Sequence, residues 1–430
     1  MKFFIKLMII LLCFGGVSLA TTEFKLKNGV NVVFKQVDGV KIVSIQLWMK
    51  TGSRNENEKN NGIAHFLEHM VFKGTEKYKP SQIDEIVESN GGQMNAATSK
   101  DYTFYYITIP SKNAEVAFDV ISEMVFKAKF LPEEIEKEKP VVIQEIKRKY
   151  DSPTYDMWVE LSKNLYKNTT YAMEVIGTED NVKSFTRETL FDYYNHFYHP
   201  ENMTLVVVGD LSQAEVKKLA EKYFNKTKEV KSGKQIIFKP TILQKNIEKT
   251  FYKNVNQAYV AISYKAFPLT SDKIYAAEVL TEILSGGEFS LLNQKLKYEK
   301  SLVTSVFGGY MGLKYDGSFT FYFTSAPNKQ KEAEKELFSL IKELKDGNLI
   351  TKNDIEKAKN RLISQFLFQH EKVSSEANDI GYSYTHDIKN YYKDYEKNIE
   401  RITLHDIKEL AKHIFSGHYV LVKTLPEESK

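Results

Sequence analysis

The sequence has little cysteine and no apolar run long enough to span a membrane. Its single cysteine, Cys13, lies in the N-terminal apolar stretch. A chain cleaved after that stretch would have no cysteine, which excludes disulfides and cysteine ligands for a metal. The net charge is also small: its formal value is +4, and removal of the two lysines in residues 1–20 would lower it further. So small a charge favours neither nucleic acid nor an anionic membrane surface as a partner.

Residues 1–20 have the pattern of a secretory signal peptide. Lys2 and Lys6 form a basic start, residues 7–14 are apolar, and Ser18-Leu-Ala20 resembles a cleavage site. The apolar run is too short for a membrane span, so we expect no stable span after cleavage. We expect a periplasmic protein if the source has two membranes, and export to the exterior otherwise.

The most informative pattern is His65-Phe-Leu-Glu68-His69. In a helix, His65 and His69 lie one turn apart on the same side, and Glu68 shares that face. Two neutral imidazoles are good zinc ligands, and a neighbouring carboxylate can accept a proton from a water that the metal activates. The order H-x-x-E-H is the inverzincin signature and predicts zinc-dependent hydrolysis.

A catalytic zinc usually takes three protein ligands, so a third ligand must come from elsewhere. In the segment 136–147, Glu138 and Glu145 lie two helical turns apart on one face. Most glutamate-rich helices are merely solvated, so these residues alone do not decide the matter. Pro140 lies between the two glutamates and predicts either a kink or a new helix that starts there.

These residues resemble the insulinase/pitrilysin family of zinc metallopeptidases, which includes the mitochondrial processing peptidase and its bacterial relatives. The further matching motifs are Gly91-Gly-Gln-Met-Asn-Ala-Ala-Thr98, Asp101-Tyr-Thr103, Asp151-Ser-Pro153, His199-Pro-Glu-Asn202 and Leu205-Val-Val-Val-Gly-Asp210. The resemblance covers nearly all of the chain after residue 20. It implies one zinc ion per chain, held by His65, His69 and Glu145. It also implies that Glu68 is the general base and that Glu138 supports the ligands from behind.

The segments 93–98 and 102–109 have the composition of neighbouring strands. Small side chains in the first segment would let another backbone approach an exposed edge, although an ordinary edge strand would look the same. The resemblance implies that an extended peptide substrate docks along Asn95, Ala96, Ala97 and Thr98. Docking through the backbone predicts broad specificity.

The resemblance also implies an arginine and a tyrosine, seven residues apart, that hold substrate near the zinc. Lys297 and Thr304 stand at those positions here. Lysine lacks the bidentate geometry of arginine, and threonine cannot reach as a phenol does. We therefore expect a heterodimer with a second family member that carries the arginine–tyrosine pair. A homodimer, or a monomer with a relaxed substrate clamp, is the alternative.

The chain is too long for one ordinary core, and it contains an internal repeat. A helix from Thr189 leads to an apolar strand at 204–209, and a helix from Thr403 leads to another at 419–423. We predict two homologous halves of an α+β fold, each a mostly antiparallel sheet with helices packed on one face. The resemblance implies that the halves enclose a chamber.

The predicted division is a signal peptide at 1–20, a catalytic zinc-binding half at 21–224, a linker at 225–245 and a second half at 246–430. Residues 225–234 at the start of the linker are polar and lysine-rich. Alignment of the repeats puts Ala277, Leu280 and Thr281 opposite His65, Glu68 and His69, so the second half should have no metal site.

The sequence therefore predicts an exported zinc endopeptidase that hydrolyses extended peptides or small unfolded proteins. One alternative is a non-catalytic, zinc-stabilised scaffold or assembly subunit of a periplasmic complex. Relatives of that kind usually lose zinc-site residues, whereas this chain has all four. A zinc hydrolase that acts on something other than peptides is the second alternative.

Overall fold

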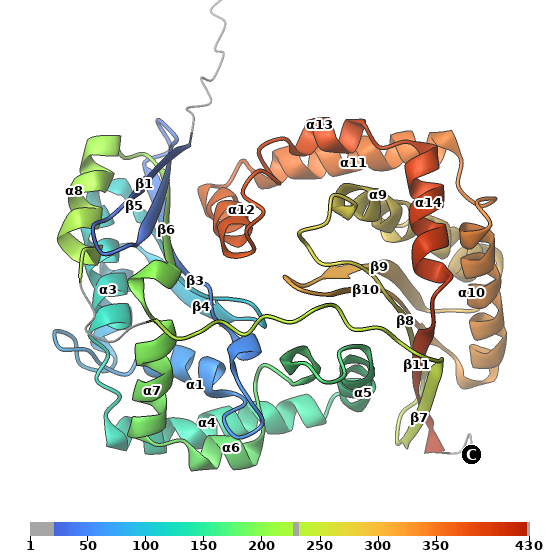
Figure 1. Cartoon of the computed structure of the whole chain (residues 1–430), viewed down its shortest axis with the longest axis horizontal. Coiled ribbons are helices and arrows are strands. Elements are labelled where there is room, and N and C mark those ends of the chain that lie inside the picture. The colour runs from blue at the N-terminus through green and yellow to red at the C-terminus, as the bar shows by residue number, and fades with distance from the viewer. Residues whose placement is uncertain (1–20, 227–231, 428–430) are drawn as a thin grey trace, which may run out of the picture.

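The computed structural model describes residues 21–226 and 232–427, which form two α+β halves that lie side by side (Figure 1). This confirms the predicted fold class. The predicted signal peptide, residues 1–20, lies outside the described residues, as do residues 227–231 of the predicted linker. The described part of that linker has neither helix nor strand, and the chain runs from it into the second half.

The first half is built on a six-stranded sheet of order β1-β2-β6-β3-β5-β4. Its strands are β1 (Thr22–Lys25), β2 (Asn31–Gln36), β3 (Ile42–Met49), β4 (Gln93–Thr98), β5 (Thr103–Pro110) and β6 (Met203–Gly209). All neighbours are antiparallel except β2 and β6. The short strand β4 is therefore an edge strand.

The second half is built on a five-stranded sheet of order β7-β11-β8-β10-β9. Its strands are β7 (Ile247–Lys253), β8 (Ala258–Lys265), β9 (Ser305–Gly312), β10 (Gly317–Ser325) and β11 (Tyr419–Pro426). Only β7 and β11 are parallel. This order and these directions match those from β2 to β4 in the first sheet, so the repeat seen in the sequence is a duplication of the fold.

Helices complete each half. Those of the first half are α1 (Ile63–Met70), α2 (Gln82–Ser89), α3 (Ala114–Phe126), α4 (Pro132–Tyr150), α5 (Tyr155–Leu165), α6 (Glu179–Ser184), α7 (Arg187–Phe197) and α8 (Gln213–Phe224). Those of the second half are α9 (Ile274–Ser285), α10 (Gln330–Lys345), α11 (Lys352–Gln369), α12 (Val373–Thr385), α13 (Tyr395–Glu400) and α14 (Leu404–Phe415). Thr186 and Thr403 begin the equivalent helices α7 and α14 with the same capping box. None of the helices in the described part of the chain is both long and apolar enough to cross a membrane.

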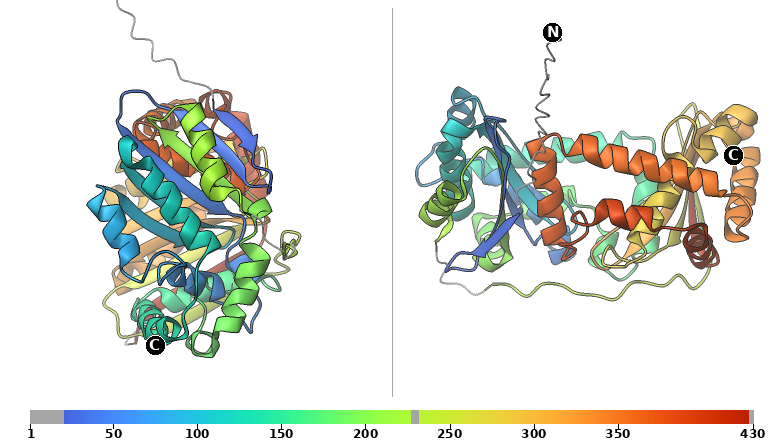
Figure 2. Two further views of the ribbon diagram at one scale, coloured as in Figure 1. Left: turned by 90° about the vertical axis from the view of Figure 1, so that its left-hand side faces the viewer. Right: turned by 90° about the horizontal axis from the view of Figure 1, so that it is seen from above.

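Each sheet is covered on its second face by a helix from the other half (Figures 1 and 2). Strand β6 shows why, because it is buried along its whole length and apolar on both faces. Its Leu205 and Val207 enter the core of the first half, whereas Val206 and Val208 face the opposite way. That second face packs against α12 of the second half. In return, α5 of the first half packs against β8 and β11. The two crossing helices hold the halves together.

The contact between α12 and the first sheet depends on a glycine. A Cβ atom at Gly381 would lie 2.1 Å from Nε1 of Trp48 on β3. That Nε1 donates a hydrogen bond to Gln46 (2.9 Å), and the Gln46 amide donates to the backbone oxygen of Ser374 (3.1 Å). A side chain at position 381 would therefore push α12 away from the sheet.

We expect Gly381→Ala to lower the free energy of unfolding by about 1–3 kcal/mol, because the added methyl group overpacks a buried contact. Urea denaturation of the purified protein measures this difference. Gly417→Ala is the matched control, since the nearest atom to a Cβ at that position is 3.5 Å away. Equal urea midpoints for the two variants would contradict the role assigned to Gly381.

Candidate metal centre

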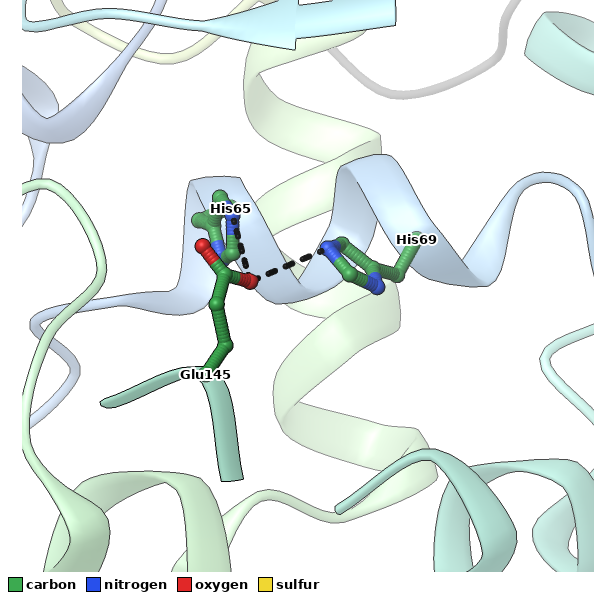
Figure 3. Close-up of side chains that lie close together, drawn as sticks. All are labelled: His65, His69 and Glu145. Carbon is green, nitrogen blue, oxygen red and sulfur yellow. Dashed lines mark ion pairs between the residues drawn. The ribbon is translucent and has the colours of Figure 1, made fainter. Parts of the chain in front are cut away.

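Helix α1 presents His65, Glu68 and His69 toward α4. Its other side is buried in the core of the first half. Figure 3 shows His65 and His69 projecting from α1 toward Glu145 on α4. Nε2 of His65 lies 3.7 Å from Oε2 of Glu145, and Nε2 of His69 lies 3.9 Å from the same oxygen. The structure thus brings together the three residues that the resemblance implied as metal ligands.

These three side chains fit a zinc ion. Tetrahedral bonds of about 2.0–2.1 Å place ligand atoms roughly 3.3–3.5 Å apart, so the observed spacings need only a small contraction. Burial lowers the pKa of His65 to about 3, with the charges of His69 and Lys149 adding to the effect. The imidazole is therefore neutral, as a metal ligand must be. Within residues 21–226 and 232–427, His65, His69 and Glu145 form the only such group of three.

Glu138 lies behind His69. Its side chain is buried, and Oε1 lies 2.9 Å from Nδ1 of His69, while Lys73 Nζ lies 2.7 Å from Oε2. Burial alone would lower the pKa of His69, but the hydrogen bond to Glu138 and the charge of Glu68 outweigh it and raise the pKa. A carboxylate on Nδ1 fixes the ring so that Nε2 points to the metal.

Helix α4 runs without interruption through Pro140. The alternative of a new helix starting at this proline is wrong. Val142 and Ile146 of the same helix are buried in the core of the first half. Their packing maintains one helix across the proline, because burial of an apolar face stabilises a helix more than propensity does. Glu138 and Glu145 consequently keep their two-turn spacing.

Glu68 is placed by an edge strand. The Thr98 hydroxyl, at the end of β4, donates a hydrogen bond to Oε2 of Glu68. Burial raises the pKa of Glu68, and the nearby charge of Glu145 adds to the rise, while the bond from Thr98 opposes it. A carboxyl group held in this way can both accept and return a proton. The sequence assigned Thr98 only to substrate docking and gave no sign of this contact.

A pocket of about 470 Å³ opens beside the three ligands. It is lined by His65, Glu68, Ala96, Ala97, Thr98, Lys100, Glu145, Lys149, Glu174, Val175 and Ile176. Of the predicted docking residues, Ala96, Ala97 and Thr98 line it, whereas Asn95 lies next to it, exposed on the same strand. One edge of β4 pairs with β5, and no described strand pairs with its other edge.

Glu56 fixes the start of α1, a role that the sequence does not reveal. Its fully buried carboxyl group accepts hydrogen bonds from the backbone N–H groups of Gly62 (2.9 Å) and Ala64 (2.8 Å). The Asn61 side chain donates a third, at 2.8 Å. Glu56 lies nine residues before His65 and outside the helix, in a separate turn. No sequence pattern therefore marks it as a cap of α1.

The predicted clamp positions lie within the second half. Lys297 forms an ion pair with Glu288 (3.1 Å), and the Thr304 hydroxyl bonds to Thr324. Neither residue lines the pocket beside His65. In the same half, α9 takes the place of α1 and carries Ala277, Leu280 and Thr281, which are no metal ligands.

Two protein-family profiles match the chain. A family profile described as "Insulinase (Peptidase family M16)" matches residues 31–179. A second profile, "Peptidase M16 inactive domain", matches residues 184–362. The first covers every residue of the candidate metal centre, and the second covers α9, where those residues are missing.

The chain is also similar to individual proteins over most of its length. It is 31% identical over 408 residues to an uncharacterized zinc protease of Bacillus subtilis, covering 94% of this chain and 98% of that protein. It is 26% identical to the mitochondrial-processing peptidase subunit beta of Dictyostelium discoideum, covering 83% and 78%. The crystal structure of a protease from Helicobacter pylori superposes with a TM-score of 0.90 at 26% identity, covering 95% and 99%.

We expect Glu138→Gln to weaken zinc binding roughly 10- to 100-fold, because the amide cannot hold His69 as the carboxylate does. Competition with a zinc chelator at neutral pH measures the dissociation constant. Glu136→Gln is the matched control, since Glu136 is exposed on the same helix and pairs only with Lys139 (2.7 Å). Unchanged zinc affinity in Glu138→Gln would show that this carboxylate does not support the ligand.

Glu56 should make stability depend on pH. Burial raises its pKa from 4.5 to about 7, although the hydrogen bonds from Gly62, Ala64 and Asn61 oppose the rise. The folded state therefore holds this proton more tightly than the unfolded chain. The resulting stabilisation is full below about pH 4.5 and is lost as the pH rises through about 7.

Relative to Glu56→Gln, the wild type should thus lose about 1–3 kcal/mol of unfolding free energy between pH 4.5 and pH 7.5. Urea denaturation at several pH values, in both proteins, gives this difference. The comparison cancels the titration of all other groups. Parallel pH profiles of wild type and variant would contradict the assignment.

Proposed function

Because the chain belongs to the insulinase family, peptidase family M16, we propose that it is an active zinc endopeptidase that cleaves extended peptides or small unfolded proteins. One observation carries the proposal: His65, Glu145, the carboxyl group of Glu68 and the edge strand β4 border one pocket, and His69 completes the group of three possible ligands. A structural zinc site would need no such pocket and no unligated carboxyl group. An edge strand beside the metal favours a peptide over other substrates.

The residues of the pocket have distinct roles. When bound, zinc supplies a Lewis acid that polarises a peptide carbonyl and makes a water more acidic. His65, His69 and Glu145 hold it, and Glu138 keeps His69 oriented. Glu68 accepts a proton from the attacking water and delivers it to the leaving nitrogen, while Thr98 holds its carboxyl group in place.

The substrate backbone pairs with the free edge of β4 in this proposal. Ala96 and Ala97 leave room for it, because their side chains are small. Docking of this kind reads the backbone, so the strand itself accepts many sequences. The pocket, with a volume of about 470 Å³, has room for a side chain next to the cleaved bond.

We also propose that a second family member completes the substrate clamp. Lys297 and Thr304 are bound to neighbours within their own half, and neither lines the pocket. The similarity to a protein named as a beta subunit supports a paired arrangement. A homodimer is the alternative. Export through residues 1–20 to the periplasm is part of the proposal and rests on the sequence pattern alone.

The test is cleavage of an unstructured, quenched-fluorescent peptide by the zinc-loaded protein without residues 1–20. We expect turnover by the wild type and a loss of at least about 100-fold in Glu68→Gln. Metal analysis should find one zinc per chain in both, because Glu68 is no ligand. Glu85→Gln, an exposed position on α2, is the matched control.

The same assay separates the alternatives. Turnover that appears only after addition of a family member with the arginine–tyrosine pair would support the heterodimer. If the isolated chain cleaved the peptide as fast as the mixture does, the heterodimer would be contradicted. If the folded, zinc-loaded chain cleaved nothing, either alone or with the added family member, the enzymatic proposal would be contradicted and the scaffold role favoured.

A further inference from the structure

The zinc pocket contains a cation that the proposed chemistry does not use. Lys149 lies one turn after Glu145 on α4 and lines the same pocket. Its side chain is exposed, and its charge reaches the ligands, where it contributes to the lowered pKa of His65. It is neither a metal ligand nor a proton carrier.

Lys149 has no carboxylate partner among the described residues, whereas several nearby lysines do. On the same helix, Lys137 pairs with Glu134 and Lys139 with Glu136, both at 2.7 Å. Lys73 pairs with Glu138 behind the metal site. Among the ion pairs between described residues, none includes Lys149. Its charge is therefore available to a ligand that enters the pocket.

The charges around it do not cancel that of Lys149. A bound zinc ion would be balanced by Glu145 and Glu68, and Glu138 is balanced by Lys73. The only other acidic residue in the lining is Glu174, whose charge interacts with that of Lys100, the other lysine in the lining. With Glu145 engaged by zinc, the charge of Lys149 would leave the α4 wall of the pocket positive.

We infer that Lys149 is a specificity-determining residue that favours peptides with an acidic side chain beside the cleaved bond. This inference rests on the proposed peptidase function. Pairing with β4 does not distinguish side chains, so discrimination must come from the pocket walls. A carboxylate on the substrate gains a partner at Lys149, whereas a basic side chain meets a like charge.

The test uses peptides of one sequence in which either residue flanking the cleaved bond is Asp, Ala or Lys. We expect kcat/KM for the better Asp peptide to exceed that for the matching Lys peptide by roughly three- to tenfold, as suits a partly exposed ion pair. Lys149→Glu should reverse this preference, and Lys149→Arg should keep it. The preference should shrink in high salt.

Lys147→Glu is the matched control. It makes the same charge change on an exposed position of α4 that does not line the pocket. Its Asp-to-Lys ratio should equal that of the wild type. Equal ratios in wild type and Lys149→Glu, or an equal shift in Lys147→Glu, would overturn the inference.

A binding measurement separates this inference from the peptidase proposal. Fluorescence anisotropy of the same labelled peptides on zinc-loaded Glu68→Gln needs no turnover. The Asp peptide should bind more tightly than the Lys peptide, and Lys149→Glu in this background should invert the order. Cleavage that fails while this inversion holds would contradict only the enzymatic proposal. Binding without a charge preference would contradict only the role of Lys149.

Discussion

The candidate centre depends on one contact, that between α1 and α4. Helix α1 carries His65, His69 and Glu68, and α4 carries Glu138 and Glu145. Because the two glutamates lie two turns apart on a single helix, one placement of α4 positions both the third ligand and the carboxylate that orients His69. The apolar sides of both helices enter the same core. That shared core sets the distance between their polar sides, so packing brings the ligands together.

The rest of the first half serves the same contact. Glu56 fixes the beginning of α1, and β4 brings Thr98 to Glu68 at the other side of the pocket. Strand β4 is the last strand in the order of the first sheet, so it lies at the edge of that sheet. One strand can thus position Glu68, the proposed general base, and offer a free edge to a peptide. The contact with Glu68 and the edge that a peptide would pair with both lie at the Thr98 end of β4.

The second half repeats the fold without the chemistry. Its sheet has the same order, yet α9 carries Ala277, Leu280 and Thr281 where α1 carries its functional residues. The second half supports the first by packing, since its helix α12 covers one face of the first sheet. In return, α5 of the first half covers one face of the second sheet (Figure 2). Such reciprocal packing resists separation of the halves, because opening them would expose two apolar sheet faces.

The sequence predicted the parts of this arrangement that are local. His65, Glu68 and His69 are adjacent in the chain, and the repeat of helix and strand in both halves is visible as a pattern. Glu145 required a resemblance, since glutamate-rich helices are common and its distance from α1 is set only by folding. The crossing of α5 and α12, the cap at Glu56 and the bond from Thr98 join residues far apart in sequence. No local rule reveals them, although the doubly apolar β6 indicates that both sheet faces need cover.

The most direct test of the central claim is a crystal structure of zinc-loaded Glu68→Gln with an uncleaved peptide, with anomalous scattering measured at the zinc edge. The account predicts one zinc peak between His65, His69 and Glu145, with the peptide backbone paired along Ala96 to Thr98. A zinc peak at other residues, or a peptide bound away from β4 with the pocket empty, would contradict it.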